Sequence, residues 1–598
     1  ISFLEITMLK DADIDLPLIE ISETWLAAFN GALMSGDIEK VAALFMKDCH
    51  WRNILAFDWQ ILTVSGSDAI VKKLMACLNT AKPPHFHLSN KHTSPRMVMR
   101  AGSDAIELIF DFTTEIGSGS GVLRLRNDRN PGNVWQAWTL STTLQALDGY
   151  PERTSAERAG SDAFSREWGG ENWQDFRNRQ RAYEDRNPAV LVVGGGQAGL
   201  GVAARLTHLG VDTLIVDKHE RIGDNWRKRY QSLTLHNEVY VNHMPYMPFP
   251  PTWPVYIPKD MLANWFEGYV EAMELNYWTG TEMTWADYDT GKKEWIVTLK
   301  KADGTERVIF PRHIIMATGA SGIPVMPELP GIKDCKCEVM HSNTYEIGHK
   351  WAGRNALVIG TGNSGHDVAQ DLHACGVKTT MVQRASTHIV SLKEAQRVYL
   401  LYAEGPSIED CDLLATSFPF PVLKIAYKGA TAMSKEIDKP LLEMLEARGF
   451  QTNDGVDNCG FQMSYLQRGG GYYFDVGCSE LIADGKIDVV QYNDIETFCV
   501  DGARLKDGKV IKADLIVMAT GYKRQQETVR QVMGDEIADR IGPVWGFDEG
   551  GELQNMWRRT PQPGLWFTAG SLAQCRIYSR FLALQIKALE EGLMTHNT

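Results

Sequence analysis

The sequence predicts an α/β protein with two parallel sheets, preceded by a small α+β domain. A hydrophobic run ends in a glycine-rich turn at residues 190–199, VLVVGGGQAG, and the same arrangement returns at 357–365, LVIGTGNSG. Each turn is followed by a helical segment and another apolar strand, which is typical of parallel strands joined by helices. In contrast, the first 150 residues read as helices followed by short strands of alternating polarity.

Length and composition limit the classes of function. A chain of 598 residues predicts three to four domains, and a formal net charge of −14 argues against a nucleic-acid-binding protein. No apolar run reaches the ~20 residues needed to cross a bilayer, and residues 1–17 lack the pattern of a signal peptide. We therefore expect a cytoplasmic protein without an integral membrane segment, and we leave a homodimer open.

Residues 1–150 are expected to form a domain of their own. Apolar residues recur at helical spacing within 19–46, and strands of alternating polarity follow at 106–112, 121–126 and 134–140. Helices followed by a curved antiparallel sheet indicate an α+β domain, and their order resembles the nuclear-transport-factor-2-like (NTF2-like) fold. For this fused domain we expect a scaffold or dimerisation role.

No metal site is predicted in this domain. His85, His87 and His92 lie close together in the sequence, but no cysteine or acidic residue accompanies them at metal-ligand spacing. His50 and Asp58 could line a pocket, although no catalytic pattern joins them.

The glycines of the first turn suit a dinucleotide. The first glycine permits a tight bend, the second leaves the backbone open to a pyrophosphate, and the third lets the helix pack against the sheet. Free N–H groups at the helix start then bind the phosphates. The residues at these positions are Gly194, Gly196, Gln197, Ala198 and Gly199, and the next strand ends at Asp217 and Lys218. An acid there would bind ribose hydroxyls, so this turn is predicted to bind FAD or NAD.

The second turn differs at the end of its following strand. Its residues are Gly360, Gly362, Asn363, Ser364 and Gly365, and Arg384 stands where the first copy has an acid. Arginine can hold a 2′-phosphate with two parallel hydrogen bonds, whereas an acid would repel it. The second turn is therefore predicted to bind NADP, and the pair implies hydride transfer from a nicotinamide to a flavin.

The cysteines argue against a disulfide reductase. The ten cysteines include no CxxC or CxxxxC pair near either turn, and Cys335 and Cys337 form a CxC too tight for the usual relay. Neither a zinc ribbon nor a disulfide framework is indicated. Oxygen is then the expected electron acceptor.

Residues 341–384 resemble the segment that identifies class B flavin-dependent monooxygenases, FxGxxxHxxxY or FxGxxxHxxxW before the NADP turn. His341 and Tyr345 stand at the histidine and aromatic positions, whereas Cys335 and Cys337 replace the phenylalanine and glycine. Tyrosine favours the flavin-containing monooxygenases over the Baeyer–Villiger enzymes.

Further stretches are similar to the same family. LIVMATGYK (515–523), with Thr520, Gly521 and Tyr522, is similar to its ATGY motif, and IIMATG (314–319) ends at Thr318 and Gly319. Residues 221–250 resemble the YUCCA-type subgroup, and 564–588 resemble the C-terminal flavin-contacting strand and helix. The resemblance covers about residues 186–598. It implies an FAD-binding domain in two parts, 187–345 and 511–598, and an NADP-binding domain at 346–510. Residues 151–186 are rich in charged residues and poor in aliphatic ones, so we expect a charged linker there.

By this resemblance, NADPH reduces FAD, and O2 forms a flavin C4a-(hydro)peroxide that inserts one oxygen atom into a small organic substrate. The expected outcomes are N- or S-oxygenation or oxidative decarboxylation of a 2-oxo acid. A Baeyer–Villiger enzyme or an NADPH oxidase remains an alternative. His236 and Asn237 are the candidate catalytic residues, although His236 could simply pack beneath the flavin, and Trp226 matches the family's aromatic residue over the flavin.

Overall fold

The structure is a computed structural model that describes residues 12–78, 84–127, 134–158 and 168–595. Its N-terminal domain contains a seven-stranded sheet of order β2-β1-β7-β6-β5-β3, with β4 paired to β5. The strands are β1 (Phe45–Ile54), β2 (Ile61–Ser65), β3 (His87–Leu88), β4 (Arg96–Arg100), β5 (Ser103–Thr113), β6 (Gly117–Arg126) and β7 (Gln136–Leu147). All pairs are antiparallel except β1 with β7. Two predicted strands fall within β5 and β6, and the third starts at Gln136 rather than at residue 134.

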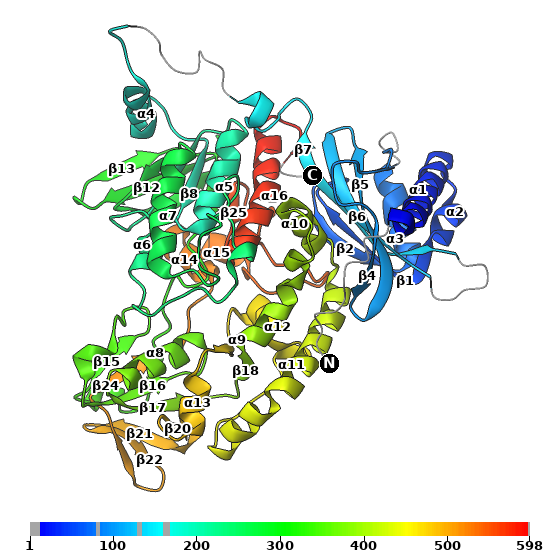
Figure 1. The fold of residues 1–598 in the computed structure, drawn as a ribbon. Helices are drawn as coiled ribbons and strands as arrows, with labels where there is room; N and C mark the ends of the chain where they lie inside the picture. The colour runs from blue at the N-terminus through cyan, green and yellow to red at the C-terminus, as the bar shows by residue number, and fades with distance from the viewer. Residues whose placement is uncertain (1–11, 79–83, 128–133, 159–167, 596–598) are drawn as a thin grey trace.

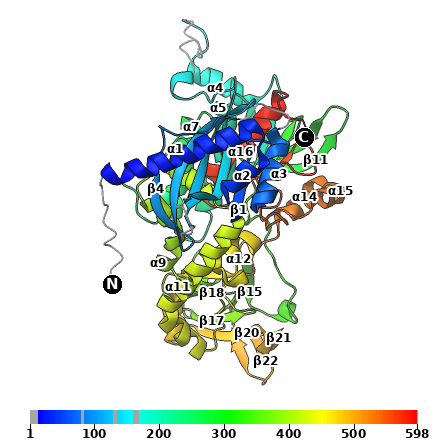
Figure 2. The same ribbon diagram turned by 90° about the vertical axis from the view of Figure 1, so that its right-hand side faces the viewer.

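Helices α1 (Ala12–Ser35), α2 (Ile38–Ala43) and α3 (Ser67–Leu78) accompany this sheet (Figure 2). Aromatic side chains fill the space between the helices and the sheet, among them Trp25, Phe29, Trp51, Phe86 and Phe110, all buried. The inside of the domain is therefore a packed core. An α+β domain is confirmed here, and the NTF2-like resemblance stays a prediction.

The first parallel sheet has the order β10-β9-β8-β14-β25. Figure 1 labels two of its strands, β8 and β25. Its strands are β8 (Val190–Val193), β9 (Thr213–Val216), β10 (Asn276–Trp278), β14 (His313–Met316) and β25 (Leu565–Phe567). β8 and β9 are almost entirely aliphatic and buried because helices such as α5 (Gln197–His208) and α16 (Leu572–Glu590) cover the sheet. β25 comes from the far end of the described chain, so two separate segments build this sheet.

The second parallel sheet has the order β15-β24-β16-β17-β20. Its strands are β15 (Glu338–His341), β16 (Asn355–Ile359), β17 (Lys378–Gln383), β20 (Asp488–Gln491) and β24 (Leu515–Met518), and α8 (Asn363–Ala374) follows β16. The two predicted parallel sheets are thus present, each with a glycine turn after a central strand.

The chain crosses twice between the sheets, and the crossing segments pair. The Val325 N–H donates to the Gly521 carbonyl at 2.9 Å, and the Lys523 N–H donates to the Ile323 carbonyl at 2.8 Å. The sequence prediction assigned residues 338–345 and 511–518 to the FAD-binding domain, but β15 and β24 lie in the second sheet. The sequence of a four-residue strand does not indicate which of two parallel sheets the strand joins.

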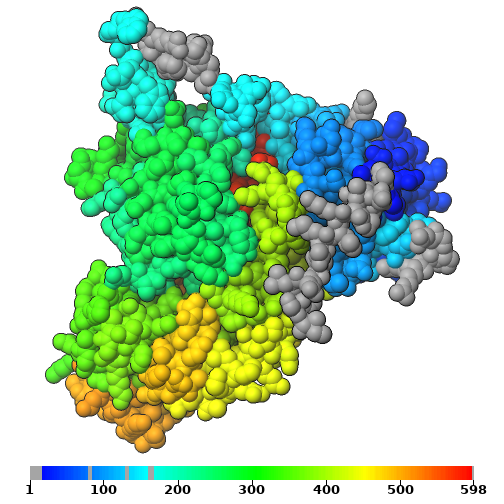
Figure 3. Space-filling model, in the orientation of Figure 1, coloured from blue at the N-terminus to red at the C-terminus, as the bar shows by residue number. Residues whose placement is uncertain are grey.

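Several helices are inserted between β17 and β20. They include η5 (Gln396–Ala403), α10 (Ile408–Thr416), α11 (Phe420–Ala447) and α12 (Gly460–Arg468), accompanied by β18 (His388–Ser391) and β19 (Tyr472–Asp475). In Figures 1 and 3 the first of these helices lie between the N-terminal domain and the rest of the molecule. None of the described helices is long and apolar enough to cross a bilayer.

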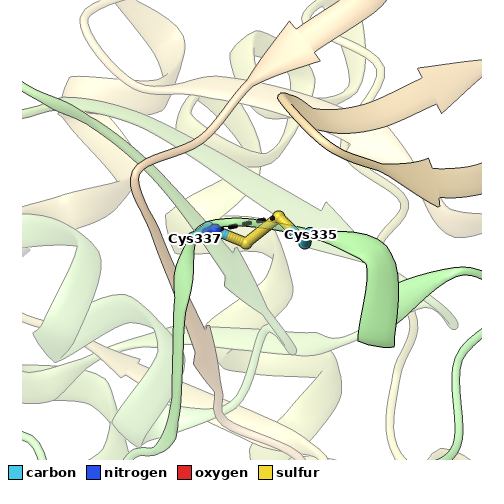
Figure 4. Close-up of a disulfide and its surroundings, with 2 residues drawn as sticks. All are labelled: Cys335 and Cys337. Atoms are coloured by element: carbon cyan, nitrogen blue, oxygen red, sulfur yellow. Dashed lines mark hydrogen bonds between the residues drawn. A yellow bond between two sulfur atoms is a disulfide. The ribbon is translucent and has the colours of Figure 1, made fainter.

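Cys335 and Cys337 form a disulfide, which the sequence analysis did not indicate (Figure 4). The bond lies just before β15, and the Cys337 N–H donates to the Cys335 Sγ at 3.4 Å. The CxC spacing argues against a redox relay but does not show whether the two cysteines form a disulfide. Spacing alone does not report how close two sulfur atoms lie in the folded chain.

Candidate functional site

One cavity of about 1220 Å³ extends from the two glycine turns to the N-terminal domain. The following site residues predicted from the sequence line this cavity: Gly194, Gly196, Gln197, Ala198, Asp217, Lys218, Trp226, His236, Asn237, Thr318, Gly319, Asn363 and Ser364. The structure therefore brings both turns and both candidate catalytic residues to one space.

The first turn fits a phosphate group. A Cβ on Gly199 would lie 2.0 Å from the Gly194 carbonyl oxygen, so this position requires glycine. Gly194 itself has φ +109°, a conformation that L side chains rarely adopt. Gly196 is the N-cap of α5 and has no side chain to block its backbone, so the N–H groups at the start of the helix remain accessible.

Asp217 lies at the end of β9, beside this turn. Its carboxylate accepts hydrogen bonds from the Gly195 N–H at 2.7 Å and the His219 N–H at 2.9 Å, and it contacts His219 Nδ1 at 2.7 Å. Burial alone would raise the pKa of Asp217, but the hydrogen bonds from His219 and Gly195 outweigh burial and lower it. Asp217 is therefore an ionised acceptor at the position where ribose hydroxyls are expected.

Hydrogen bonds orient the side chains of Trp226 and Gln197, which both line the cavity. Trp226 Nε1 donates to Gln197 Oε1 at 3.1 Å, and Gln197 Nε2 donates to the Gly570 carbonyl at 3.2 Å. Gly570 precedes α16, so the first turn and the C-terminal helix face the same part of the cavity. On the opposite side, Thr318 Oγ1 accepts a hydrogen bond from Gln525 Nε2 at 3.4 Å.

The second turn repeats this geometry. Gly360 has φ +116°, and a Cβ on Gly365 would lie 2.2 Å from the Gly360 carbonyl oxygen. Gly362 is the N-cap of α8, and its nearest neighbour for a Cβ, the Tyr472 carbonyl oxygen, is 3.7 Å away. Arg384 follows β17 and is exposed, it does not line the cavity, and the described residues give it no ion pair. Its guanidinium is available to an anion.

His366 on α8 makes this turn sensitive to acid. Its ring stacks on Tyr473 with centroids 3.8 Å apart, Nδ1 contacts the Gly362 carbonyl at 3.2 Å, and burial lowers its pKa to about 4. The unfolded chain binds the proton first, so the stabilising effect of the neutral ring is lost as pH falls from 6.5 toward 4. At pH 5 the loss is about 2 kcal/mol.

We expect His366→Phe, which keeps the stacked ring, to show less acid destabilisation than the wild type. The measurement is the free energy of unfolding in urea at pH 7.5 and pH 5 for both proteins. Equal losses in the two proteins would show that His366 does not titrate in this way.

His236 is one of the residues that line the cavity. Its Nδ1 is buried without a hydrogen-bond partner among the described residues, its ring lies 5.4 Å from the Phe474 ring, and its carbonyl accepts from Gln396 Nε2 at 2.9 Å. Burial lowers the pKa of His236, against a smaller opposing effect of Asp367, so the ring is neutral near pH 7. A buried ring nitrogen without a partner calls for a ligand atom, which fits a bound cofactor or substrate.

His341 and the ATGY segment lie outside the cavity lining. His341 Nε2 contacts the Gly521 carbonyl at 3.1 Å, and its ring packs against Tyr522 at 5.1 Å. Thr520 Oγ1 donates to the Val325 carbonyl at 2.5 Å. None of these four residues lines the cavity, so the structure places them at the crossing between the two sheets. Their predicted cofactor contact stays a prediction.

Seven tyrosines line the cavity, and the sequence analysis predicted none of them. Four of the seven are Tyr399, Tyr427, Tyr465 and Tyr472. Burial raises the pKa of Tyr399 to about 12, against a hydrogen bond from Asn237 that opposes it. Tyr465 Oη donates to Gln574 Oε1 at 2.7 Å. These four tyrosines come from four separate elements, η5, α11, α12 and β19, so no local sequence pattern marks them as a group.

The N-terminal domain also reaches the cavity, through Arg52. Its guanidinium donates to both carboxylate oxygens of Glu552, at 3.0 and 2.7 Å, and to the Thr416 carbonyl. Burial opposes the charge of Arg52, but Glu552 outweighs burial and raises the pKa of Arg52. Arg52 and Glu552 are 500 positions apart, and nothing local to either residue predicts their contact.

Comparisons with known proteins agree with this geometry. The profile of the pyridine nucleotide-disulphide oxidoreductase family matches residues 191–398. Indole-3-pyruvate monooxygenase YUCCA1 of Oryza sativa subsp. japonica is 28% identical over 364 residues, 60% of this chain and 83% of that protein. Probable indole-3-pyruvate monooxygenase YUCCA4 of Arabidopsis thaliana is 30% identical over 344 residues, 56% of this chain and 76% of that protein.

Among solved structures, OTEMO in complex with FAD and NADP shares the fold with a TM-score of 0.50 and 17% identity. The match covers 68% of this chain and 87% of that one. The disulfide relay suggested by the profile's name has no counterpart in the cavity, because neither Cys335 nor Cys337 lines it. The identity to the Arabidopsis relative over most of its length, together with the two glycine turns, shows that the chain belongs to the class B flavin-dependent monooxygenases and is an NADPH- and FAD-dependent oxidoreductase.

Proposed function

We propose that the chain oxygenates a soft nitrogen or sulfur atom of a small organic substrate with O2. The observation that carries the proposal is the neutral His236, whose buried Nδ1 has no hydrogen-bond partner in the described part of the chain. His236 lines the same cavity as both glycine turns and the tyrosines. When bound, the flavin supplies the electron transfer and the oxygen activation.

The chain's own residues bind and orient the reactants. The start of α5 binds one pyrophosphate and the start of α8 the other, while Asp217 and Arg384 distinguish ribose hydroxyls from a 2′-phosphate. His236, held by Gln396, offers a neutral ring nitrogen as a hydrogen-bond partner to the reacting centre. The enclosing aromatic side chains exclude water, which limits the unproductive release of H2O2.

Oxidative decarboxylation of a 2-oxo acid is the second candidate. The relatives named indole-3-pyruvate monooxygenases favour it. The test measures NADPH and O2 consumption, H2O2 and products with amine, thioether, ketone and 2-oxo-acid panels. Oxygenated amine or thioether supports the first candidate, and a decarboxylated acid supports the second. An ester from a ketone indicates a Baeyer–Villiger enzyme, and H2O2 alone indicates an NADPH oxidase.

His236→Leu is expected to lower product formation by about 10²-fold, because one hydrogen-bond partner of the reacting centre is lost. NADPH consumption then appears mainly as H2O2. His236→Asn, which keeps a polar group at this position, should restore part of the ratio of product to NADPH consumed. Equal ratios in the wild type and both variants would remove His236 from the chemistry and leave it as a packing residue.

A cytoplasmic location and a homodimer complete the proposal. Apart from the Cys335–Cys337 pair, the described cysteines form no disulfide, which is typical of a reducing compartment. Subcellular fractionation tests the location, and sedimentation of the purified protein tests the dimer.

A further inference from the structure

The N-terminal domain is packed as part of the enzyme. The sheet residues Ile61, Leu144 and Leu147 belong to the same buried core as α5 and α16. A second contact joins Ile109 and Val122 to α10. Because these side chains are buried in the joint core, the domain has a fixed place beside the cavity.

The cavity reaches the surface at the turn between β4 and β5. Met99 near the end of β4 and Ala101 in the turn line the cavity together with Leu400 and Leu401 of η5. Met99 is 70% exposed and Leu400 is 52% exposed, so these side chains border both the cavity and the solvent. The entrance, defined here as these four residues, presents apolar side chains and is shared between the N-terminal domain and the insert. Two charged residues, Arg100 and Glu404, also line the cavity beside it.

An ion pair joins the two sides of the entrance. Arg100 donates to both carboxylate oxygens of Glu404, each at 2.7 Å, and Arg96 Nη2 contacts Glu404 at 2.9 Å. Arg100 is also hydrogen-bonded to the buried Glu107 of β5, at 3.1 and 2.8 Å. Two parallel hydrogen bonds fix both distance and orientation, so they hold η5 against the N-terminal domain.

The outer part of the cavity is defined here as the part lined by Arg52, Arg100, Arg397 and Arg558. Each of these arginines has a carboxylate partner. The pairs are Arg52 with Glu552, Arg100 with Glu404, Arg397 with Glu394, and Arg558 with Asp548. The remaining lining cations, Lys218 and Arg229, lie at the cofactor side, next to Asp217 and Tyr522 respectively. A substrate carboxylate entering the outer part would meet no free cation among the described residues, and its burial would be costly.

We propose that the N-terminal domain forms the outer wall and entrance of the substrate chamber, and that it selects uncharged, largely apolar substrates entering between the β4–β5 turn and η5. This inference rests on the proposed function and narrows it, because it favours neutral thioethers and amines over 2-oxo acids. The tyrosine hydroxyls within the chamber can hydrogen-bond a neutral polar group without requiring a charge.

The first test narrows the entrance. Met99→Trp in the full chain is expected to raise the KM of methyl biphenyl sulfide by about 10-fold, with a smaller effect on methyl phenyl sulfide. Met97→Trp is the matched control, because Met97 is 48% exposed on the same face of β4 but does not line the cavity. Equal effects of the two substitutions, or no dependence on substrate size, would overturn the inference.

The second test concerns charge. We expect the wild type to bind the methyl ester of para-(methylthio)benzoate about 10-fold or more tightly than the free acid, measured by titrating the flavin absorbance. Glu552→Gln frees the Arg52 charge while keeping the shape of its partner, so it should reduce this preference. Tighter binding of the acid by the wild type, or no binding of the ester, would overturn the inference. The wild-type comparison decides the matter even if Glu552→Gln does not fold.

Failure of this inference is distinguishable from failure of the proposed function. A protein without bound flavin or without NADPH-dependent O2 consumption contradicts the proposed function. A protein that has both but shows no effect of Met99→Trp and no ester preference contradicts only the role of the N-terminal domain.

Discussion

The Gly199→Ala variant is expected to purify without flavin. The added Cβ would lie 2.0 Å from the Gly194 carbonyl oxygen, a backbone atom that can move only if the turn opens. Opening the turn displaces the N–H groups at the start of α5 from the phosphates. Each lost hydrogen bond to a charged group costs about 1.5–3 kcal/mol, so losing two weakens FAD binding by at least about 10²-fold. The measurement is the flavin absorbance of the purified protein before and after adding FAD.

Gly201→Ala is the matched control on the same helix. A Cβ at Gly201 would meet its nearest atoms, the Cys575 carbonyl oxygen and Pro245 Cγ, at 3.6 Å, which is an ordinary contact. This variant should keep its flavin, since alanine also favours the helix. Retention of flavin by Gly199→Ala, or its loss from both variants, would contradict the assignment of the first turn.

Arg384→Ala is expected to raise the KM for NADPH by about 10- to 100-fold and to leave the KM for NADH unchanged. Arg384 follows β17 as Asp217 follows β9, and it is exposed. A guanidinium that holds a 2′-phosphate contributes about 1.5–3 kcal/mol, whereas NADH offers no phosphate there. Steady-state kinetics with both nucleotides measure the difference.

Arg504→Ala provides the comparison for this charge change. Arg504 is exposed on β22 (Gly502–Leu505), a strand outside the two parallel sheets, and its removal changes the net charge equally. It should leave both KM values near those of the wild type. If Arg384→Ala raised both KM values by the same factor, the arginine would not recognise the 2′-phosphate.

The glycine turns could be predicted because their determinants are local. Gly194, Gly199, Gly360 and Gly365 lie within a few residues of the contacts that require them, and the strand and helix around each turn are marked by periodicity. A helix follows each turn as predicted, α5 after the first and α8 after the second. Local sequence therefore specified the two cofactor-facing ends of the cavity.

The substrate-facing end could not be predicted, because its determinants are distant in sequence. Tyr399, Tyr427 and Tyr472 belong to separate elements of an insert whose sequence has no recognised motif. Arg52 meets Glu552 only because the N-terminal sheet packs onto the C-terminal helix. The same reason explains the misplaced boundaries: the sheet that β15 or β24 joins is decided by tertiary pairing.

The N-terminal domain packs against α16, a helix that is synthesised much later, and this contact affects how the chain folds during synthesis. Ile61, Leu144 and Leu147 are buried by α16, and β25 completes the sheet begun by β8. While the ribosome is still translating the middle of the chain, this apolar face has no covering partner, and exposed surfaces of this kind bind chaperones or aggregate. The nascent enzyme should therefore become resistant to proteases only after β25 and α16 have emerged from the ribosome, rather than on completion of the N-terminal domain.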